Sequence, residues 1–210
     1  MISVTQAIGT AIFLALAANL CYKWFKNLYN PEKEPSGTSL DTTPIGTDRT
    51  AGADKLRKKA EGWARSHDGK VIGPVELEWN GLHAHYDFIV VGWFGALGVN
   101  CLGYSGTIYG TVEEEEWTQE KNGERSSFPN PLPINQNAAR VLRGVLMDNG
   151  LRNLTNDAVT VYTGFDVKLA IPRRVAYHTS DSFIAMLRRS DRFNADKGAD
   201  VEALCKLLQP

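Results

Sequence analysis

An aspartate lies inside one of the most apolar stretches of the sequence, where a charged side chain requires a partner. Asp87 directly precedes the run at residues 88–91, and His83 and His85 lie four and two residues before it. Side chains two residues apart share one face of a strand, so two imidazoles and a carboxylate could bind a metal ion together. Two alternatives stay open: a structural carboxylate that pairs with a neighbouring donor, and solvated histidines that follow a turn.

Charged clusters elsewhere bear on whether nucleic acid is a partner. Basic side chains that could contact phosphates gather in two places, at Lys55 with residues 57–59 and at Arg188, Arg189 and Arg192. Exposed helices near a membrane surface carry similar residues. Residues 113–116 are four glutamates, which form either a solvated loop or an acidic patch that repels nucleic acid. The sequence contains no phosphate-cradling glycine loop, no HExxH and no nucleophile elbow.

The elements that would position Asp87 follow from the spacing of apolar residues. Helical periodicity predicts helices over residues 54–66, 135–148 and 182–189. Short alternating or β-branched runs predict strands over residues 70–72, 75–79, 86–91, 96–102 and 158–162, with a turn at Asn80-Gly81. Residues 127–131 are expected to form a loop. This order of elements predicts an α/β domain in which helices cover a mixed sheet.

Four stretches in this part of the chain resemble the nuclease-related domain, or NERD, family. They are the first helix with Val75-Glu76-Leu77, the strand Tyr86-Asp87-Phe88-Ile89-Val90-Val91-Gly92, the run Tyr104-Ser105-Gly106-Thr107-Ile108-Tyr109-Gly110 with Trp117, and Asn130-Pro131-Leu132 with Gln136-Asn137. The second is similar to the family's Asp-x-Ile-Val-Val strand, and the third to its Ser-Gly-x-Ile-x-Gly motif. The resemblance covers about residues 51–190 and implies a restriction-endonuclease-like fold.

The resemblance also implies a set of reactive positions. In the family an Asp and a following Glu-x-Lys hold Mg²⁺ and activate water, with an acid and a Gln from helices assisting. Asp87 matches the first acid, and Gln136 matches the helix Gln. Asn100 stands at the Glu position and Leu102 at the Lys position, so the site loses an anionic ligand and its cation. Asp54 or Glu61 would be the helix acid.

These substitutions favour a pseudonuclease that serves as a binding or scaffolding module rather than an enzyme. No cofactor is expected, and a residual Mg²⁺ site would involve Asp87. One alternative is an active Mg²⁺-dependent nuclease whose acid has moved to Glu76 or Glu78, and its lysine to Lys70 or Lys168. Another is an accessory subunit of a membrane complex. A protein partner is compatible with these hypotheses, and nucleic acid is the less expected partner.

The first part of the chain has the composition of a membrane anchor. Residues 1–22 contain no charged side chain and would span about 33 Å as a helix. Lys23 and Lys26 follow with Trp24 and Phe25, which predicts a single-pass helix with its N-terminus outside and the domain in the cytoplasm. A signal peptide and a buried helix are the alternatives. The expected organisation is an anchor with its flank over residues 1–29, a flexible linker over 30–50, the NERD-like domain over 51–190 and a weakly helical tail over 191–210.

The composition excludes several classes of protein. The 210 residues carry 23 basic and 24 acidic side chains, and 43% of them are hydrophobic. These values exclude a wholly disordered chain, a collagen-like or coiled-coil rod and a strongly basic nucleic-acid binder. Cys21, Cys101 and Cys205 are widely separated, with no CxxC pair, so they are expected to be reduced structural residues.

Overall fold

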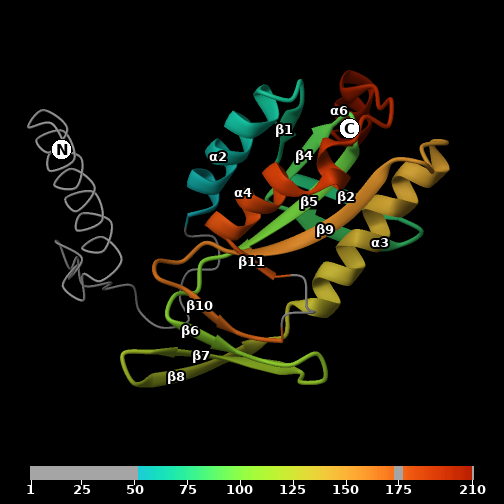
Figure 1. Ribbon diagram of the computed structural model, residues 1–210. Helices are drawn as coiled ribbons and strands as arrows, with labels where there is room; N and C mark the ends of the chain where they lie inside the picture. The colour runs from blue at the N-terminus through green and yellow to red at the C-terminus, as the bar shows by residue number, and fades with distance from the viewer. Residues whose placement is uncertain (1–51, 173–176, 210) are drawn as a thin grey trace, which may run out of the picture. The chain divides into compact units, whose positions relative to one another are not determined.

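The computed structural model describes residues 52–172 and 177–209 (Figure 1). The predicted anchor, over residues 1–29, and the predicted linker, over residues 30–50, both lie outside these residues. Within the described part of the chain, every helix is too short or too polar to cross a bilayer. The described residues form a mixed α/β domain, as the periodicity predicted.

A five-stranded sheet forms the centre of this domain, with the strand order β1-β4-β5-β9-β11. β1 (Lys70–Ile72), β4 (Phe88–Gly92) and β5 (Gly95–Leu102) are antiparallel neighbours. β9 (Thr155–Tyr162) runs parallel to β5, and β11 (Tyr177–Thr179) parallel to β9. The sheet is therefore mixed.

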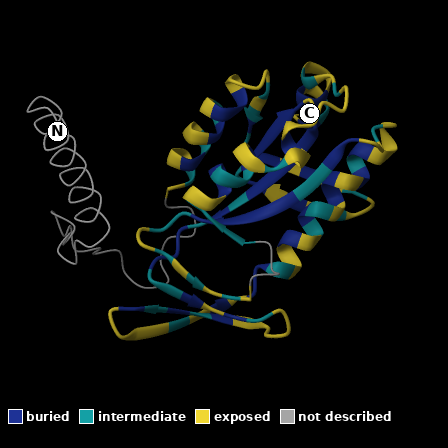
Figure 2. Ribbon diagram, viewed as in Figure 1, coloured by how far each residue is buried: buried dark blue, intermediate teal, exposed yellow. Residues whose placement is uncertain are grey.

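Both faces of the sheet are covered, which explains the continuous apolar run of β4. Phe88 and Val90 point to a core cluster shared with α2 (Ala53–Arg65) and α4 (Ser180–Arg189). Ile89 and Val91 point to a second cluster shared with α3 (Leu132–Asp148) and the hairpin of β2 (Val75–Trp79) and β3 (Leu82–Tyr86). Figure 2 shows the central strands as buried and the outer helical surfaces as exposed. A strand buried on both faces needs apolar residues at every position.

Two local features shape this core, and the sequence predicted the first of them. The Asn80-Gly81 turn joins β2 to β3 with positive φ angles of 48° and 76°, the conformation that this dipeptide favours in hairpins. At Gly98 the ring of Tyr86 lies against the backbone, and a Cβ there would come within 2.4 Å of the ring. The Tyr86 hydroxyl donates a hydrogen bond of 2.6 Å to the carbonyl of Ala138 in α3, and so ties the helix to the sheet.

A second sheet of four strands was not predicted. It has the order β10-β6-β7-β8 and consists of β6 (Thr107–Tyr109), β7 (Glu116–Lys121), β8 (Glu124–Pro129) and β10 (Lys168–Ala170). The expectation of a loop over residues 127–131 is wrong in part, because Ser127 and Phe128 pair with β7. Phe128 packs with Trp117 in a small aromatic cluster that closes one side of this sheet.

The segment after residue 190 is part of the packed domain. It contains α5 (Asp191–Asn194) and α6 (Val201–Leu208). Leu204 and Leu208 of α6 are 1% and 0% exposed, and they pack in the same cluster as α3. The core therefore extends past the expected boundary at residue 190, and the predicted weakly helical tail is a core helix.

Candidate functional site

Asp87 lies between β3 and β4, at a break between the two strands. Its amide donates to the carbonyl of Val99 at 3.0 Å, and its Oδ2 accepts a hydrogen bond of 2.6 Å from the amide of Cys101. The Asp87 side chain is 18% exposed. The carboxylate thus accepts the hydrogen bond of a backbone amide on β5, which is the structural alternative that the sequence left open.

The two histidines of the predicted metal site each face a glutamate across the β2–β3 hairpin. His85 Nδ1 lies 2.5 Å from Glu76 Oε1, and its Nε2 lies 3.8 Å from Asp87 Oδ1. His83 Nδ1 lies 3.7 Å from Glu78 Oε2. The described residues contain no group of three or more His, Cys, Asp or Glu side chains placed to hold one metal ion. Instead, the His85 ring lies between the carboxylates of Glu76 and Asp87 and contacts both.

A surface cavity of about 210 Å³ opens beside Asp87 at the N-terminus of α2. Asp54 and Arg57 of α2 line it together with Asp87. Arg57 donates to the carbonyl of Gly73 at 2.8 Å and to Glu61 Oε1 at 3.1 Å. Of the two acids suggested on this helix, Asp54 therefore lines the cavity, whereas Glu61 pairs with Arg57 on the helix surface.

Asn100 and Leu102 lie on β5, opposite Thr160 and Tyr162 of β9. The side-chain oxygen of Asn100 is buried and accepts no hydrogen bond from the described residues. Leu102 is half-buried against the aromatic cluster that contains Tyr104 and Tyr162. The two family-equivalent positions therefore present a neutral amide and an aliphatic side chain on the same strand.

The helix amide that faces the sheet is Asn135 rather than Gln136. Gln136 is exposed. Asn135 is 8% exposed, and its Nδ2 donates to the carbonyl of Ala158 on β9 at 2.9 Å. Its oxygen is buried and has no hydrogen-bond partner among the described residues. The spacing of the sequence indicated that Asn135 faces the core, because it lies three residues before Ala138, which is buried in the same helix.

The residues proposed as relocated catalytic groups lie in several places. Lys70 forms an ion pair with Glu202 of α6. Lys168 lies on β10, in the four-stranded sheet, opposite Thr107. Of the four candidates, Glu76 is linked to Asp87, through His85.

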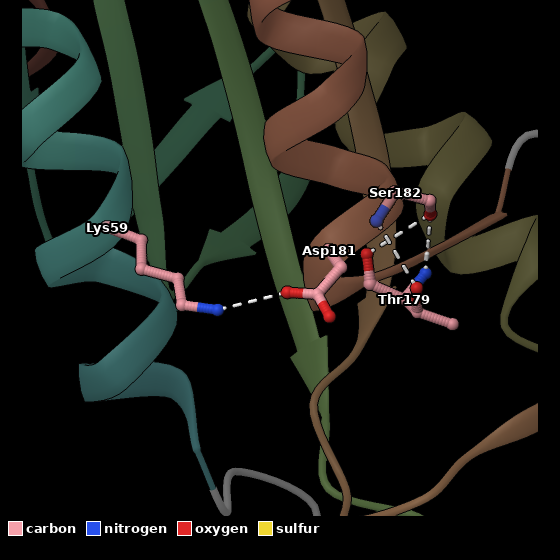
Figure 3. Close-up of polar contacts among 4 residues, drawn as sticks. All are labelled: Lys59, Thr179, Asp181 and Ser182. Carbon is pink, nitrogen blue, oxygen red and sulfur yellow. Dashed lines mark hydrogen bonds and ion pairs between the residues drawn. The ribbon is translucent and has the colours of Figure 1, made fainter. Parts of the chain in front are cut away.

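Basic residues line a different cavity, of about 420 Å³, between α2 and α4. Figure 3 shows Lys59 of α2 reaching Asp181 at the start of α4, with Nζ and Oδ1 3.1 Å apart. Thr179 and Ser182 cap this helix reciprocally. Arg188 and Arg189 also line the cavity. Lys59, one of the basic residues singled out from the sequence, is therefore paired with a carboxylate of α4.

The mixed sheet with helices on both faces, and with the carboxylate of Asp87 directly before a central strand, defines an α/β domain with a candidate acidic site. Comparison with family profiles identifies it further. The profile of the nuclease-related domain matches residues 48–163, more than half of the chain. The chain belongs to this nuclease-related domain family. Comparisons with curated proteins and with solved structures gave no significant match.

Proposed function

We propose that this protein is a membrane-tethered pseudonuclease, with a restriction-endonuclease-like domain that binds or scaffolds a partner without cleaving nucleic acid. The observation that carries the proposal is the pair of residues at the reactive positions of β5. Asn100 contributes no charge, and Leu102 packs against aromatic side chains instead of presenting an ammonium group. Stabilisation of a developing phosphate charge depends on such cations and metal ions.

The residues around Asp87 fit the family's Mg²⁺ poorly. Mg²⁺ requires an octahedral set of oxygen ligands, usually with one or two carboxylates. Asp87 Oδ2 already accepts the Cys101 amide, and the positively charged Arg57 lines the same cavity. Asp54 is the second carboxylate of that cavity. We therefore derive no hydrolytic step through a metal ion at this place.

The competing function is an active nuclease, and Asp54 is the feature that favours it. A carboxylate on α2 that shares a cavity with Asp87 provides a second anion near the strand acid. Such a site would still lack the lysine, because Lys70 is paired with Glu202. The pseudonuclease therefore has the stronger support.

A cleavage assay distinguishes the two functions. The full chain, purified in detergent, is incubated with labelled DNA and RNA in the presence of Mg²⁺ or Mn²⁺. We expect no turnover above that of the Asp87→Ala variant. Turnover that requires Asp87 would overturn the proposal, and its loss in Asp54→Asn would then assign the second ligand.

Restoring the missing charges provides the converse test. The double variant Asn100→Glu/Leu102→Lys returns an acid and a lysine to one face of β5, because the two positions are two residues apart. We expect it to gain Mg²⁺-dependent cleavage of nucleic acid that Asp87→Ala abolishes. Asn100→Gln/Leu102→Met has similar side-chain volumes without the charges and is the matched control. A folded double variant without activity would show that lost charges alone do not explain the inactive site.

The membrane part of the proposal is supported by the uncharged residues 1–22 and the basic flank at Lys23 and Lys26. We expect the full chain to remain in the membrane fraction after alkaline extraction. A green fluorescent protein fused to the C-terminus should fluoresce, since that terminus is proposed to be cytoplasmic. Release of the chain by alkali, or a dark but fully expressed fusion, would contradict the anchor or its orientation.

A further inference from the structure

A cavity of about 550 Å³ lies where α3 ends and β9 begins. Arg143, Arg152, Arg192 and Lys197 all line it. They come from four separate segments: the last turns of α3, the connection to β9, the short helix α5 and the connection to α6. The cationic side chains are thus brought together by the tertiary fold and not by a basic run in the sequence.

This cavity is separate from the site at Asp87. Thr155, which lines it, pairs with Gly95 at the first residue of β5. Asp87 contacts the amide of Cys101, six residues further along that strand. At 3.3 Å per residue the two sites are about 20 Å apart.

Local contacts fix the segments that carry the cations. The amides of Gly150 and Leu151 close the end of α3 with hydrogen bonds of 3.1 and 2.9 Å to its last turn, and Arg152 follows directly. The amide of Lys197 donates to the carbonyl of Trp93 at 3.0 Å. Arg192 Nη1 lies 2.8 Å from Asp157 Oδ2. The backbone around the cavity is therefore held before any ligand arrives.

The charge of the cavity is unbalanced. Four cationic side chains and no carboxylate belong to its described lining, in a chain whose 23 basic and 24 acidic residues nearly cancel overall. Asp157 pairs with Arg192, whereas Arg143, Arg152 and Lys197 form no ion pair with any described residue. Like charges that converge without counter-charges favour the binding of an anion.

We propose that this cavity binds a small phosphorylated ligand through a phosphomonoester or diphosphate group. Guanidinium groups match phosphate oxygens in a bidentate way, and three of the four cations are arginines. The volume lies within the range of small-molecule sites, about 300–1,000 Å³. A nucleic-acid backbone would instead require a basic stripe across a face, and the cations here converge on one cavity.

The test uses the full chain in detergent and isothermal titration with ADP, with adenosine as the ligand that lacks phosphate. Two further probes identify the source of the phosphate. Pyrophosphate represents the diphosphate of a nucleotide, and glycerol 3-phosphate is the soluble headgroup of phosphatidic acid. Their affinities are compared with that of ADP. Arg143→Gln/Arg152→Gln removes two exposed, unpaired cations of the cavity. Arg188→Gln/Arg189→Gln removes two exposed arginines of α4 and is the matched control.

We expect saturable binding of ADP and none of adenosine. The cavity variant should bind at least about tenfold more weakly, since each charge-assisted contact contributes about 1.5–3 kcal/mol and 1.4 kcal/mol is tenfold. The α4 variant should change affinity by less than about twofold. Tighter binding of glycerol 3-phosphate than of ADP would support the proposal and assign a lipid headgroup.

Three results would overturn this proposal: no binding of any of the phosphorylated probes, equal binding of adenosine and ADP, or an equal loss in both arginine variants. A single-stranded oligonucleotide that binds far more tightly than ADP, with the same dependence on Arg143 and Arg152, would replace the small ligand by nucleic acid. None of these results depends on whether the domain cleaves nucleic acid.

Discussion

Replacing Asp87 tests whether its carboxylate holds the structure together or is kept for chemistry. In Asp87→Ala, the amide of Cys101 loses an acceptor at 2.6 Å in a place where the Asp87 side chain is only 18% exposed. An unsatisfied buried donor costs about 1–3 kcal/mol. For a domain of this size about 2 kcal/mol corresponds to a fall in Tm of roughly 4–8 °C. Asp87→Asn keeps an oxygen acceptor, so it should lose only about 1 kcal/mol.

Thermal and urea unfolding of the full chain, followed by circular dichroism, measures these changes. His85→Ala is the control, because the 3.8 Å contact of His85 with Asp87 involves a side chain that is 53% exposed and should contribute less than about 1 kcal/mol. The reasoning fails if Asp87→Ala is as stable as the wild type, or if His85→Ala destabilises as much as Asp87→Ala. Equal losses in Asp87→Ala and Asp87→Asn would point to the charge rather than to the hydrogen bond.

Three further predictions concern buried groups. Burial raises the pKa of the Cys101 thiol far above its ordinary value. After treatment with an alkylating reagent at pH 8, peptide-resolved mass spectrometry should find Cys101 unmodified until the protein is unfolded. Rapid alkylation of Cys101 in the native protein would contradict its burial. Burial lowers the pKa of His178, so on acidification the unfolded chain takes up a proton before the folded protein does. The free energy of unfolding should therefore fall as the pH drops below about 6.5, the ordinary pKa of histidine. In urea titrations His178→Asn should reduce that fall, and an unchanged pH profile would refute the assignment to His178. Leu204→Ala should cost about 2–5 kcal/mol because Leu204 is 1% exposed, whereas the exposed Lys206→Ala should cost little; equal stabilities would mean that α6 is not part of the core.

Periodicity predicted α2, α3 and α4 and most strands of the central sheet, because their core residues recur at helical or strand spacing. It missed α5 and the edge strand β11. The run around β4 is apolar at every position, which only a strand covered on both faces requires. The four-stranded sheet was missed because β7 buries polar as well as apolar side chains, Trp117 and Gln119 among them. The Asn122-Gly123 dipeptide between β7 and β8, with φ angles of 54° and 81°, was the available signal for that hairpin.

The candidate site was predictable only in part. Asp87 stood out as a charge within the strand predicted over residues 86–91, but the structure interrupts that strand at Asp87, between β3 and β4. The partner of the carboxylate there is the Cys101 amide. The prediction of Gln136 as the helix amide followed motif spacing, and the helix turns that side chain outward and Asn135 inward. Which of two adjacent side chains near the start of a helix faces the sheet is hard to predict when the first residue of the helix is uncertain. Here α3 begins at Leu132, three residues before the predicted start.

The sequence by itself determined the α/β class, the family and the neutral residues Asn100 and Leu102 at the two positions that the family resemblance assigns, because these depend on residue types and on short-range order. Only the tertiary structure decided which charges meet. It brought Asp54 beside Asp87, paired Lys70 with Glu202, and gathered the four cations of the α3–β9 cavity from distant segments. Electrostatic interactions depend on distance and burial, and neither quantity is encoded in the spacing of residues along the chain.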